Sequence, residues 1–129
     1  HEQNCRYVYQ ALQQEAGLVD LFSTFDEHHP QRILIEQQQT GHVPILTFRL
    51  VGDKACAWRF MNALKLVRLC TNIGDAQTMI THPASTTHGR YSAEERQKLG
   101  ITDDLVRLCI GLEEPSDVVQ DIQQALKSV

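Results

Sequence analysis

Apolar residues recur at the three- and four-residue spacing of an amphipathic helix in four parts of this 129-residue chain. Two of these segments carry clear start signals: Asp53 can cap the helix after it, and Ser92 with Glu95 has the form of a capping box. Pro115 suits the first turn of the last helix, and Gly17 suits the C-terminal cap of the first. The predicted helices are residues 2–16, 54–67, 92–99 and 115–129, and residues 31–40 are predicted as a polar turn or short helix.

Four further segments are apolar or alternate with period two, as β-strands do. Gly52 ends one of them and Pro83 ends another. The predicted strands are residues 18–25, 45–51, 78–82 and 105–112. Because the strands are separated by helices of unequal length, with a tight turn near residues 71–77, we predict an α+β fold. Helices would cover one face of a small, mostly antiparallel sheet, and residues 1–129 would form one domain.

The bulk composition narrows the class of protein. Hydrophobic residues make up 42% and charged residues 22%, which is typical of a globular domain. The net charge of −4, with scattered basic residues, argues against a nucleic-acid surface, and the apolar runs are too short to span a membrane. The four cysteines are widely spaced and lack a zinc spacing, so we expect reduced thiols in a cytoplasmic protein and no metal site.

Arg107 is the first candidate for a binding residue. The predicted core face of its strand is formed by Val106, Leu108, Ile110 and Leu112. Arg107 would lie on the opposite face, among small neighbours, where a ligand could dock. A planar guanidinium fork on a rigid strand matches a carboxylate. An ordinary exposed arginine with a surface ion pair is the alternative that the pattern alone leaves open.

Thr78 is the second candidate, because its hydroxyl follows a Gly-Asp turn at the start of a predicted strand. The alternative is a threonine that simply favours β-structure. His82 and His88 flank a Pro-containing loop, where we expect them to order the loop through hydrogen bonds rather than to act as bases. The paired carboxylates, such as Glu113-Glu114, suit capping better than acid–base chemistry.

Two strings, Gly74–His88 and Gly100–Glu113, resemble the C-terminal end of the pyridoxal-phosphate enzymes of cysteine and methionine metabolism. In that family, the Arg in the motif Leu-Val/Ile-Arg-Leu-Ser-Val-Gly binds the α-carboxylate of the substrate, and Arg107 falls on its position. Cys109 stands where the family usually has Ser. Thr78 stands where a family Ser helps to position the substrate carboxylate and the catalytic lysine. The Gly-Asp-x-x-Thr form of this turn is similar to that of homoserine-ester sulfhydrylases.

The resemblance implies the small C-terminal domain of a fold-type I pyridoxal-phosphate enzyme. The full-length protein would be an O-acylhomoserine sulfhydrylase, which acts on a homoserine ester and a sulfur nucleophile. Cystathionine γ-synthase and methionine γ-lyase are alternatives within the family. A stand-alone, non-catalytic amino-acid-binding module is the alternative outside it.

The same resemblance implies that part of the enzyme is absent from this chain. None of the four lysines has the Ser-x-Thr-Lys context of the Schiff-base lysine, and no Gly-rich phosphate loop precedes a helix. The chain begins at His1 and enters a helical pattern directly, so we expect a domain or fragment that lacks the large cofactor-binding domain. We expect the isolated chain to bind no cofactor and to be inactive, and the full-length enzyme to be a homo-oligomer.

Overall fold

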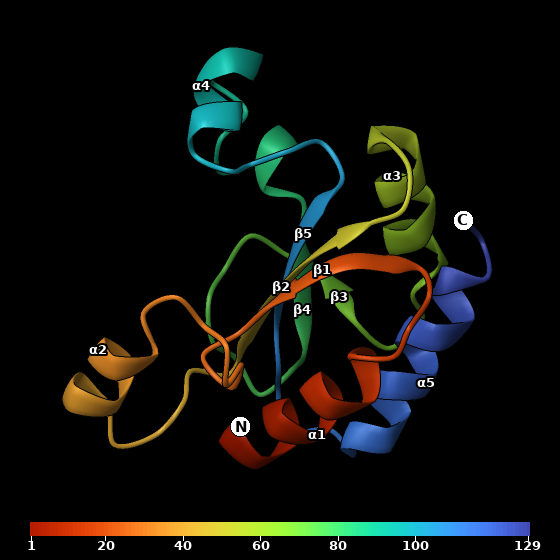
Figure 1. The fold of residues 1–129 in the computed structure, drawn as a ribbon. Helices are drawn as coiled ribbons and strands as arrows, with labels where there is room; N and C mark the ends of the chain where they lie inside the picture. Colours follow the sequence, from red (N-terminus) through yellow and green to blue (C-terminus); the bar gives the residue numbers. More distant parts are fainter.

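A computed structural model describes residues 1–129, with one five-stranded sheet at the centre of the fold (Figure 1). The helices are α1 (Glu2–Leu12), α2 (Arg32–Gln38), α3 (Lys54–Ala63), α4 (Ala93–Lys98) and α5 (Pro115–Leu126), with a short 3₁₀ turn, η1 (Pro83–Ser85). The strands are β1 (Leu18–Phe22), β2 (Ile45–Leu50), β3 (Arg68–Leu69), β4 (Met79–Thr81) and β5 (Leu105–Cys109). The predicted α+β class is confirmed.

The strands lie in the order β1-β2-β5-β4-β3, so the last strand of the chain is the central one. Every neighbouring pair is antiparallel except β3 and β4, which are parallel. The register places Thr47 of β2 and Thr81 of β4 on either side of Arg107. Strand β5 is therefore hydrogen-bonded to a neighbouring strand along each of its two edges, which holds its backbone rigidly.

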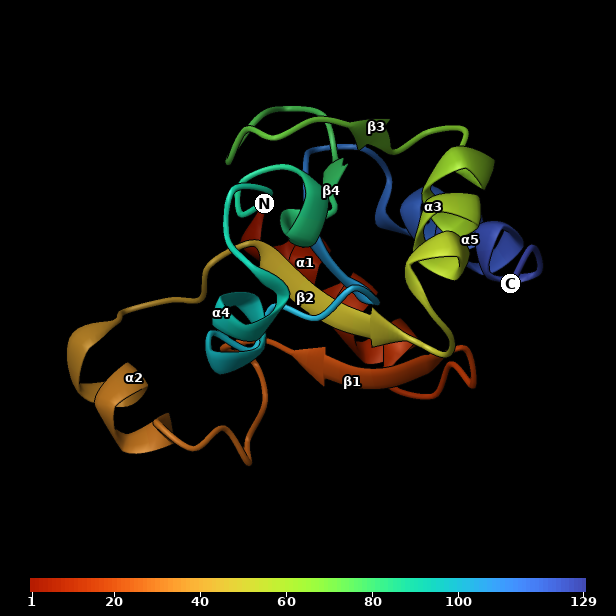
Figure 2. The same ribbon diagram turned by 90° about the horizontal axis from the view of Figure 1, so that it is seen from above.

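Three helices cover one face of the sheet. Figures 1 and 2 show α1 and α5 side by side against this face, with α3 next to α5, whereas α2 and α4 lie away from these three helices. The core between the layers includes Val8 and Leu12 of α1, Phe48 of β2, Leu108 of β5 and Ile122 of α5. The predicted one-sided helical cover is confirmed for α1, α3 and α5. None of the helices is long and apolar enough to cross a membrane.

The local start signals are confirmed where the sequence carries them. Asp53 accepts a hydrogen bond from the Cys56 N–H, and Ser92 and Glu95 form both hydrogen bonds of a capping box. These bonds hold the pKa of Asp53 and of Glu95 below their ordinary values. The acidic side chains therefore stay ionised at the helix N-termini, where their negative charge interacts favourably with the helix dipole.

Several predicted boundaries are wrong. Helix α1 ends at Leu12 with Gln13 as its cap, so Gly17 is not a helix cap. A Cβ atom on Gly17 would instead lie 3.0 Å from a methyl carbon of Leu126 in α5, which shows how closely the chain passes this helix. The short strand β3 was not predicted, because two exposed residues carry no alternation.

The predicted two-faced character of residues 105–112 is also wrong in part. Strand β5 ends at Cys109, and Leu112, predicted in the core, is 60% exposed. Leu105 and Cys109, predicted on an open face, are buried. Apolar residues therefore occupy both sets of alternating positions along this strand.

The four cysteines are free thiols. Cys5 lies in the core between α1 and the sheet, and burial raises the pKa of its thiol to about 12. A thiol with so high a pKa is protonated at neutral pH and is a poor nucleophile.

Candidate functional site

Arg107 lies in the middle of β5, and its guanidinium is held by the protein main chain. Its Nη2 donates to the carbonyl oxygens of Thr71 at 3.2 Å and Asn72 at 3.1 Å. Both carbonyls belong to the exposed loop 71–77, between β3 and β4. The two bonds fix the plane of the guanidinium without neutralising its charge.

No carboxylate of this chain pairs with Arg107. The ion pairs are formed by Arg6, Arg32, Arg49 and Arg96. Arg107 therefore does not form the surface ion pair that was the alternative prediction. The Nε atom of Arg107 is buried and has no hydrogen-bond partner. A buried donor without a partner is costly, and the cation that carries it has no counter-charge within the chain.

Thr78 is completely buried, and its polar atoms are used within the chain. Its N–H donates to Glu113 Oε1 at 2.6 Å, and its hydroxyl donates to Glu113 Oε2 at 2.7 Å. The same hydroxyl oxygen accepts a hydrogen bond from the Gly111 N–H at 2.9 Å. Thr78 therefore joins the start of β4 to the segment that follows β5.

The structure does not bring the two predicted binding residues into contact. Thr78 has no hydrogen bond to Arg107, which lies opposite Thr81 across the β4–β5 pair. They are connected through loop 71–77: Thr78 follows its last residue, and the carbonyls of its first two residues hold Arg107. Glu113, predicted to serve a helix cap, is instead the acceptor for Thr78.

His82 orders the loop after β4, as predicted. The imidazole is completely buried, with Nδ1 at 2.7 Å from Ser85 Oγ and Nε2 at 2.8 Å from the Asp103 carbonyl oxygen. Both ring nitrogens are engaged, so the ring has no free nitrogen for acid–base chemistry. His88 is half-buried, with Nδ1 at 2.9 Å from the Thr87 hydroxyl and its ring 5.5 Å from the Tyr91 ring, so it has only local contacts.

Three elements of the site were missed by the sequence-based prediction. Two are the carbonyl groups of Thr71 and Asn72, which leave no residue-type signal because every residue has a carbonyl. The third is the carboxylate of Glu113. Its position directly after the Gly111-Leu112 pair was the one available signal, since a Gly in an apolar segment of this kind indicates a close backbone approach.

Gly111 marks that close approach, and we expect Gly111→Ala to damage the site locally. A Cβ atom at this position would lie 2.4 Å from the Ala76 carbonyl oxygen and 2.6 Å from the Gln77 carbonyl carbon. Because both are main-chain atoms, the segment would have to move, at a cost of about 1–3 kcal/mol. Urea unfolding should detect the loss, whereas Gly74→Ala, with open space around its Cβ position, should cost only the strain of its positive φ.

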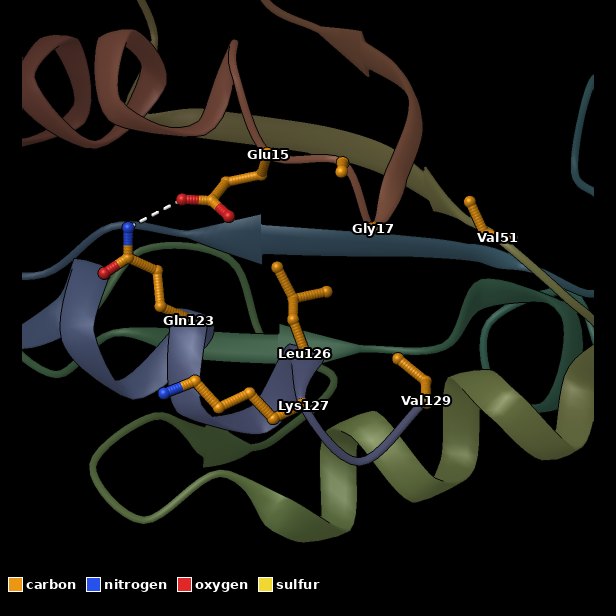
Figure 3. A pocket seen from close by; sticks show the side chains of 8 residues that line it. Glu15, Gly17, Val51, Gln123, Leu126, Lys127 and Val129 are labelled. Carbon is orange, nitrogen blue, oxygen red and sulfur yellow. Dashed lines mark hydrogen bonds between the residues drawn. The ribbon is translucent and has the colours of Figure 1, made fainter.

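A pyridoxal-phosphate Schiff base needs a lysine, and no lysine of this chain is buried. Its four lysines, Lys54, Lys65, Lys98 and Lys127, are all exposed. Lys127 lines a surface hollow with Glu15, Val51, Leu126 and other residues at the C-terminal end of α5, and its side chain lies at the rim (Figure 3). This hollow contains no residue of β5 or of loop 71–77, so the lysine is not at the Arg107 site.

Comparison with known proteins gives the family. Residues 1–127 match the model of the family described as Cys/Met metabolism PLP-dependent enzyme. The chain is 37% identical over 118 residues to the O-succinylhomoserine sulfhydrylase of Pseudomonas aeruginosa, an alignment covering 92% of the chain and 29% of that protein. It is 35% identical over 129 residues to the L-methionine gamma-lyase of Fusobacterium nucleatum subsp. polymorphum, covering all of the chain and 33% of the relative.

Solved structures show the same fold. A cystathionine γ-lyase of Micromonospora echinospora superposes with a TM-score of 0.92 at 26% identity, over 98% of this chain and 33% of that one. An O-acetylhomoserine (thiol)-lyase of Campylobacter jejuni gives a TM-score of 0.91 at 33% identity, over 99% and 31%, and its structure holds N′-pyridoxyl-lysine-5′-monophosphate. The chain thus spans about a third of the length of the relatives that it matches. It belongs to the Cys/Met metabolism family of pyridoxal-phosphate-dependent enzymes.

Proposed function

We propose that residues 1–129 are the C-terminal, substrate-binding domain of an O-acylhomoserine sulfhydrylase. Such an enzyme replaces the acyl group of an O-acyl homoserine with a sulfur nucleophile. The observation that carries the proposal is Arg107, an unneutralised guanidinium fixed by the carbonyls of Thr71 and Asn72 on the central strand. The resemblance to the P. aeruginosa O-succinylhomoserine sulfhydrylase supports the choice within the family.

In this proposal Arg107 binds the α-carboxylate of the amino-acid substrate. The guanidinium has donors that the two carbonyls leave free, and a carboxylate can accept two of them side by side. Binding at the carboxylate orients the substrate while leaving its reacting side chain free. Thr78 assists indirectly, since its hydroxyl is bound to Glu113 and Gly111 and fixes the end of loop 71–77.

Pyridoxal phosphate supplies the electron sink for this chemistry when it is bound. We propose that its lysine and phosphate site belong to a large domain outside residues 1–129, because every lysine of this chain is exposed and away from Arg107. The isolated chain should therefore be inactive and bind no cofactor. A homo-oligomeric full-length enzyme in the cytoplasm completes the proposal.

Other functions are favoured by particular observations. The alignment of all 129 residues with a third of a methionine gamma-lyase, and the string Tyr91–Arg96 that resembles this subfamily, favour a γ-lyase. A cystathionine γ-synthase would use Arg107 in the same way. A stand-alone amino-acid-binding module would also need Arg107, but no cofactor.

The test is to isolate the protein that contains this chain from its native source and to measure its mass, its absorbance and its activities. We expect a protein about three times the length of this chain, by analogy with its relatives, with a pyridoxal chromophore. It should consume O-acetyl- or O-succinylhomoserine with sulfide faster than it cleaves L-methionine. Faster release of methanethiol from L-methionine would instead identify a γ-lyase.

The isolated 129-residue chain separates the enzyme from the stand-alone module. Mixed with pyridoxal phosphate and dialysed, it should retain no chromophore, and calorimetry should detect no binding of L-homoserine or L-methionine. A native protein of 14.7 kDa that binds these amino acids, and loses the binding on Arg107→Ala, would establish the module and contradict the enzyme.

A further inference from the structure

The turn between β5 and α5 brings together the start of the chain, the end of β5 and the entry to β4. The Asn4 side-chain amide donates to the carbonyl oxygens of Glu113 at 2.7 Å and Gly111 at 3.3 Å. His1 Nδ1 lies 2.8 Å from the Ile110 carbonyl oxygen. The main chain of the turn is thus fixed from α1, so the Glu113 carboxylate projects from a rigid base.

From this base the Glu113 carboxylate holds the last part of the loop that precedes β4. It accepts from both the N–H and the hydroxyl of Thr78, at 2.6 and 2.7 Å. Next to it, the Leu112 N–H donates to the Ala76 carbonyl oxygen at 2.7 Å. The close packing of Gly111 on Ala76 shows that the two segments are in direct contact. Residues 76–78 are therefore tied to the turn at several atoms.

The same loop holds Arg107 at its other end. The Cys70 N–H donates to the Ile80 carbonyl oxygen at 3.0 Å, and the next two residues supply the carbonyls that hold the guanidinium. Residues 71–77 are all exposed, so no core packing fixes their path. The position of the two carbonyls depends on the hydrogen bonds at the two ends of the loop, and Glu113 makes two of those bonds.

We propose that Glu113 is a positioning residue for Arg107. Its carboxylate fixes Thr78, Thr78 fixes the C-terminal end of loop 71–77, and the loop holds the Thr71 and Asn72 carbonyls against the guanidinium. Glu113 touches neither substrate nor cofactor in this role. The inference rests on the proposed function of Arg107 as the carboxylate-binding residue, and it adds the residue that sets the orientation of the arginine.

Glu113→Gln is the informative change because it keeps the size of the side chain. It replaces one of the two acceptor oxygens with an NH₂ group, which would face either the Thr78 N–H, a donor, or the Thr78 hydroxyl, which would then have to accept instead of donate. Both hydrogen bonds lose their charge and the Thr78 hydroxyl loses its acceptor, while the main-chain bonds from Asn4 remain possible. The loop end should loosen without the loss of the fold.

The experiment uses the full-length enzyme and two competitive inhibitors, L-norleucine and L-norleucinamide. They share the amino group and side chain, but norleucinamide lacks the carboxylate. The ratio of their inhibition constants therefore reports on the carboxylate site alone. For Glu113→Gln we expect the preference for norleucine to fall by about tenfold, the equivalent of one charge-assisted hydrogen bond. The neighbouring Glu114→Gln, an exposed carboxylate, should leave the ratio unchanged.

Arg107→Gln is measured beside these variants to separate the two proposals. A collapsed ratio for Arg107→Gln with an unchanged ratio for Glu113→Gln would overturn the positioning role and leave the proposed function standing. An unchanged ratio for Arg107→Gln would overturn both. If both inhibitors weaken equally in Glu113→Gln, with a lower Tm, then Glu113 is merely structural and the inference fails.

A second pair of variants covers the case in which Glu113→Gln does not fold. Thr78→Val removes the hydroxyl that Glu113 holds, and Thr78→Ser keeps it. The preference for norleucine should fall in Thr78→Val and be restored in Thr78→Ser. Equal ratios in these two variants would contradict the inference.

Discussion

Replacing Arg107 with alanine in the full-length enzyme should lower kcat/KM for an O-acyl homoserine. The expected loss of binding free energy is about 2–5 kcal/mol, as for the loss of one partner of a buried charge pair. At about 1.4 kcal/mol for each factor of ten, this is roughly a 30-fold to several-thousand-fold loss. The reason is that the substrate carboxylate would enter a partly dehydrated site without its counter-charge. Steady-state rates with O-acetyl- and O-succinylhomoserine measure the effect.

Arg107→Lys tests the geometry as distinct from the charge. Lysine keeps the positive charge but lacks the planar guanidinium fork. Its ammonium group has three donors, too few to bind both carboxylate oxygens and the carbonyls of Thr71 and Asn72 at once. We expect it to recover only part of the loss. Arg68→Ala, on the edge strand β3, is the matched control, because this arginine is exposed and forms no ion pair. A loss of less than a few tenths of a kcal/mol for Arg107→Ala would contradict the assigned role.

Strand alternation was sufficient to place Arg107 but not its surroundings. The period of two correctly separates Arg107 from the core residues Val106 and Leu108. It cannot show that β5 is central, because strand order depends on pairings between segments far apart in the chain. Nor does it show that Leu105 and Cys109, which share the face of Arg107, are buried.

The contacts of the site that the sequence did not reveal join residues far apart in the chain or involve main-chain groups. Glu113 reaches Thr78 across 35 positions, and the carbonyls that hold Arg107 lie 35 and 36 positions before it. Two consecutive acidic residues before a helix are typical of a helix N-terminus. The sequence-based prediction therefore placed Glu113 at the start of α5 and not against Thr78. By contrast, Ser92 and Glu95 act within one helical turn, and their pattern predicted their bonds correctly.

Asp121 also contacts residues far from it in the chain. Asp121→Asn should lower the free energy of unfolding by about 2–4 kcal/mol at neutral pH, because buried N–H groups lose a charged acceptor. The carboxylate, on α5 and only 6% exposed, accepts from the main-chain N–H groups of Lys65, Leu66 and Val67 at 2.8–2.9 Å. It thereby fixes the segment that leads into β3. Urea unfolding of the 129-residue chain measures the loss, and Asp117→Asn, exposed on the same helix, should cost less than about 1 kcal/mol.

The destabilisation should also depend on pH in a defined direction. Burial by itself raises the pKa of Asp121, but the hydrogen bonds from Val67, Lys65 and Leu66 outweigh it, so the pKa lies below its ordinary value. A carboxyl group with a lowered pKa in the folded state stabilises that state fully above the unfolded pKa, about 3.9, and loses this contribution as the pH falls through the folded pKa. The stability difference between wild type and Asp121→Asn should therefore be constant near neutral pH and shrink below about pH 4. A difference that stayed constant down to pH 2 would show that packing, and not the ionised carboxylate, holds residues 65–67 against α5.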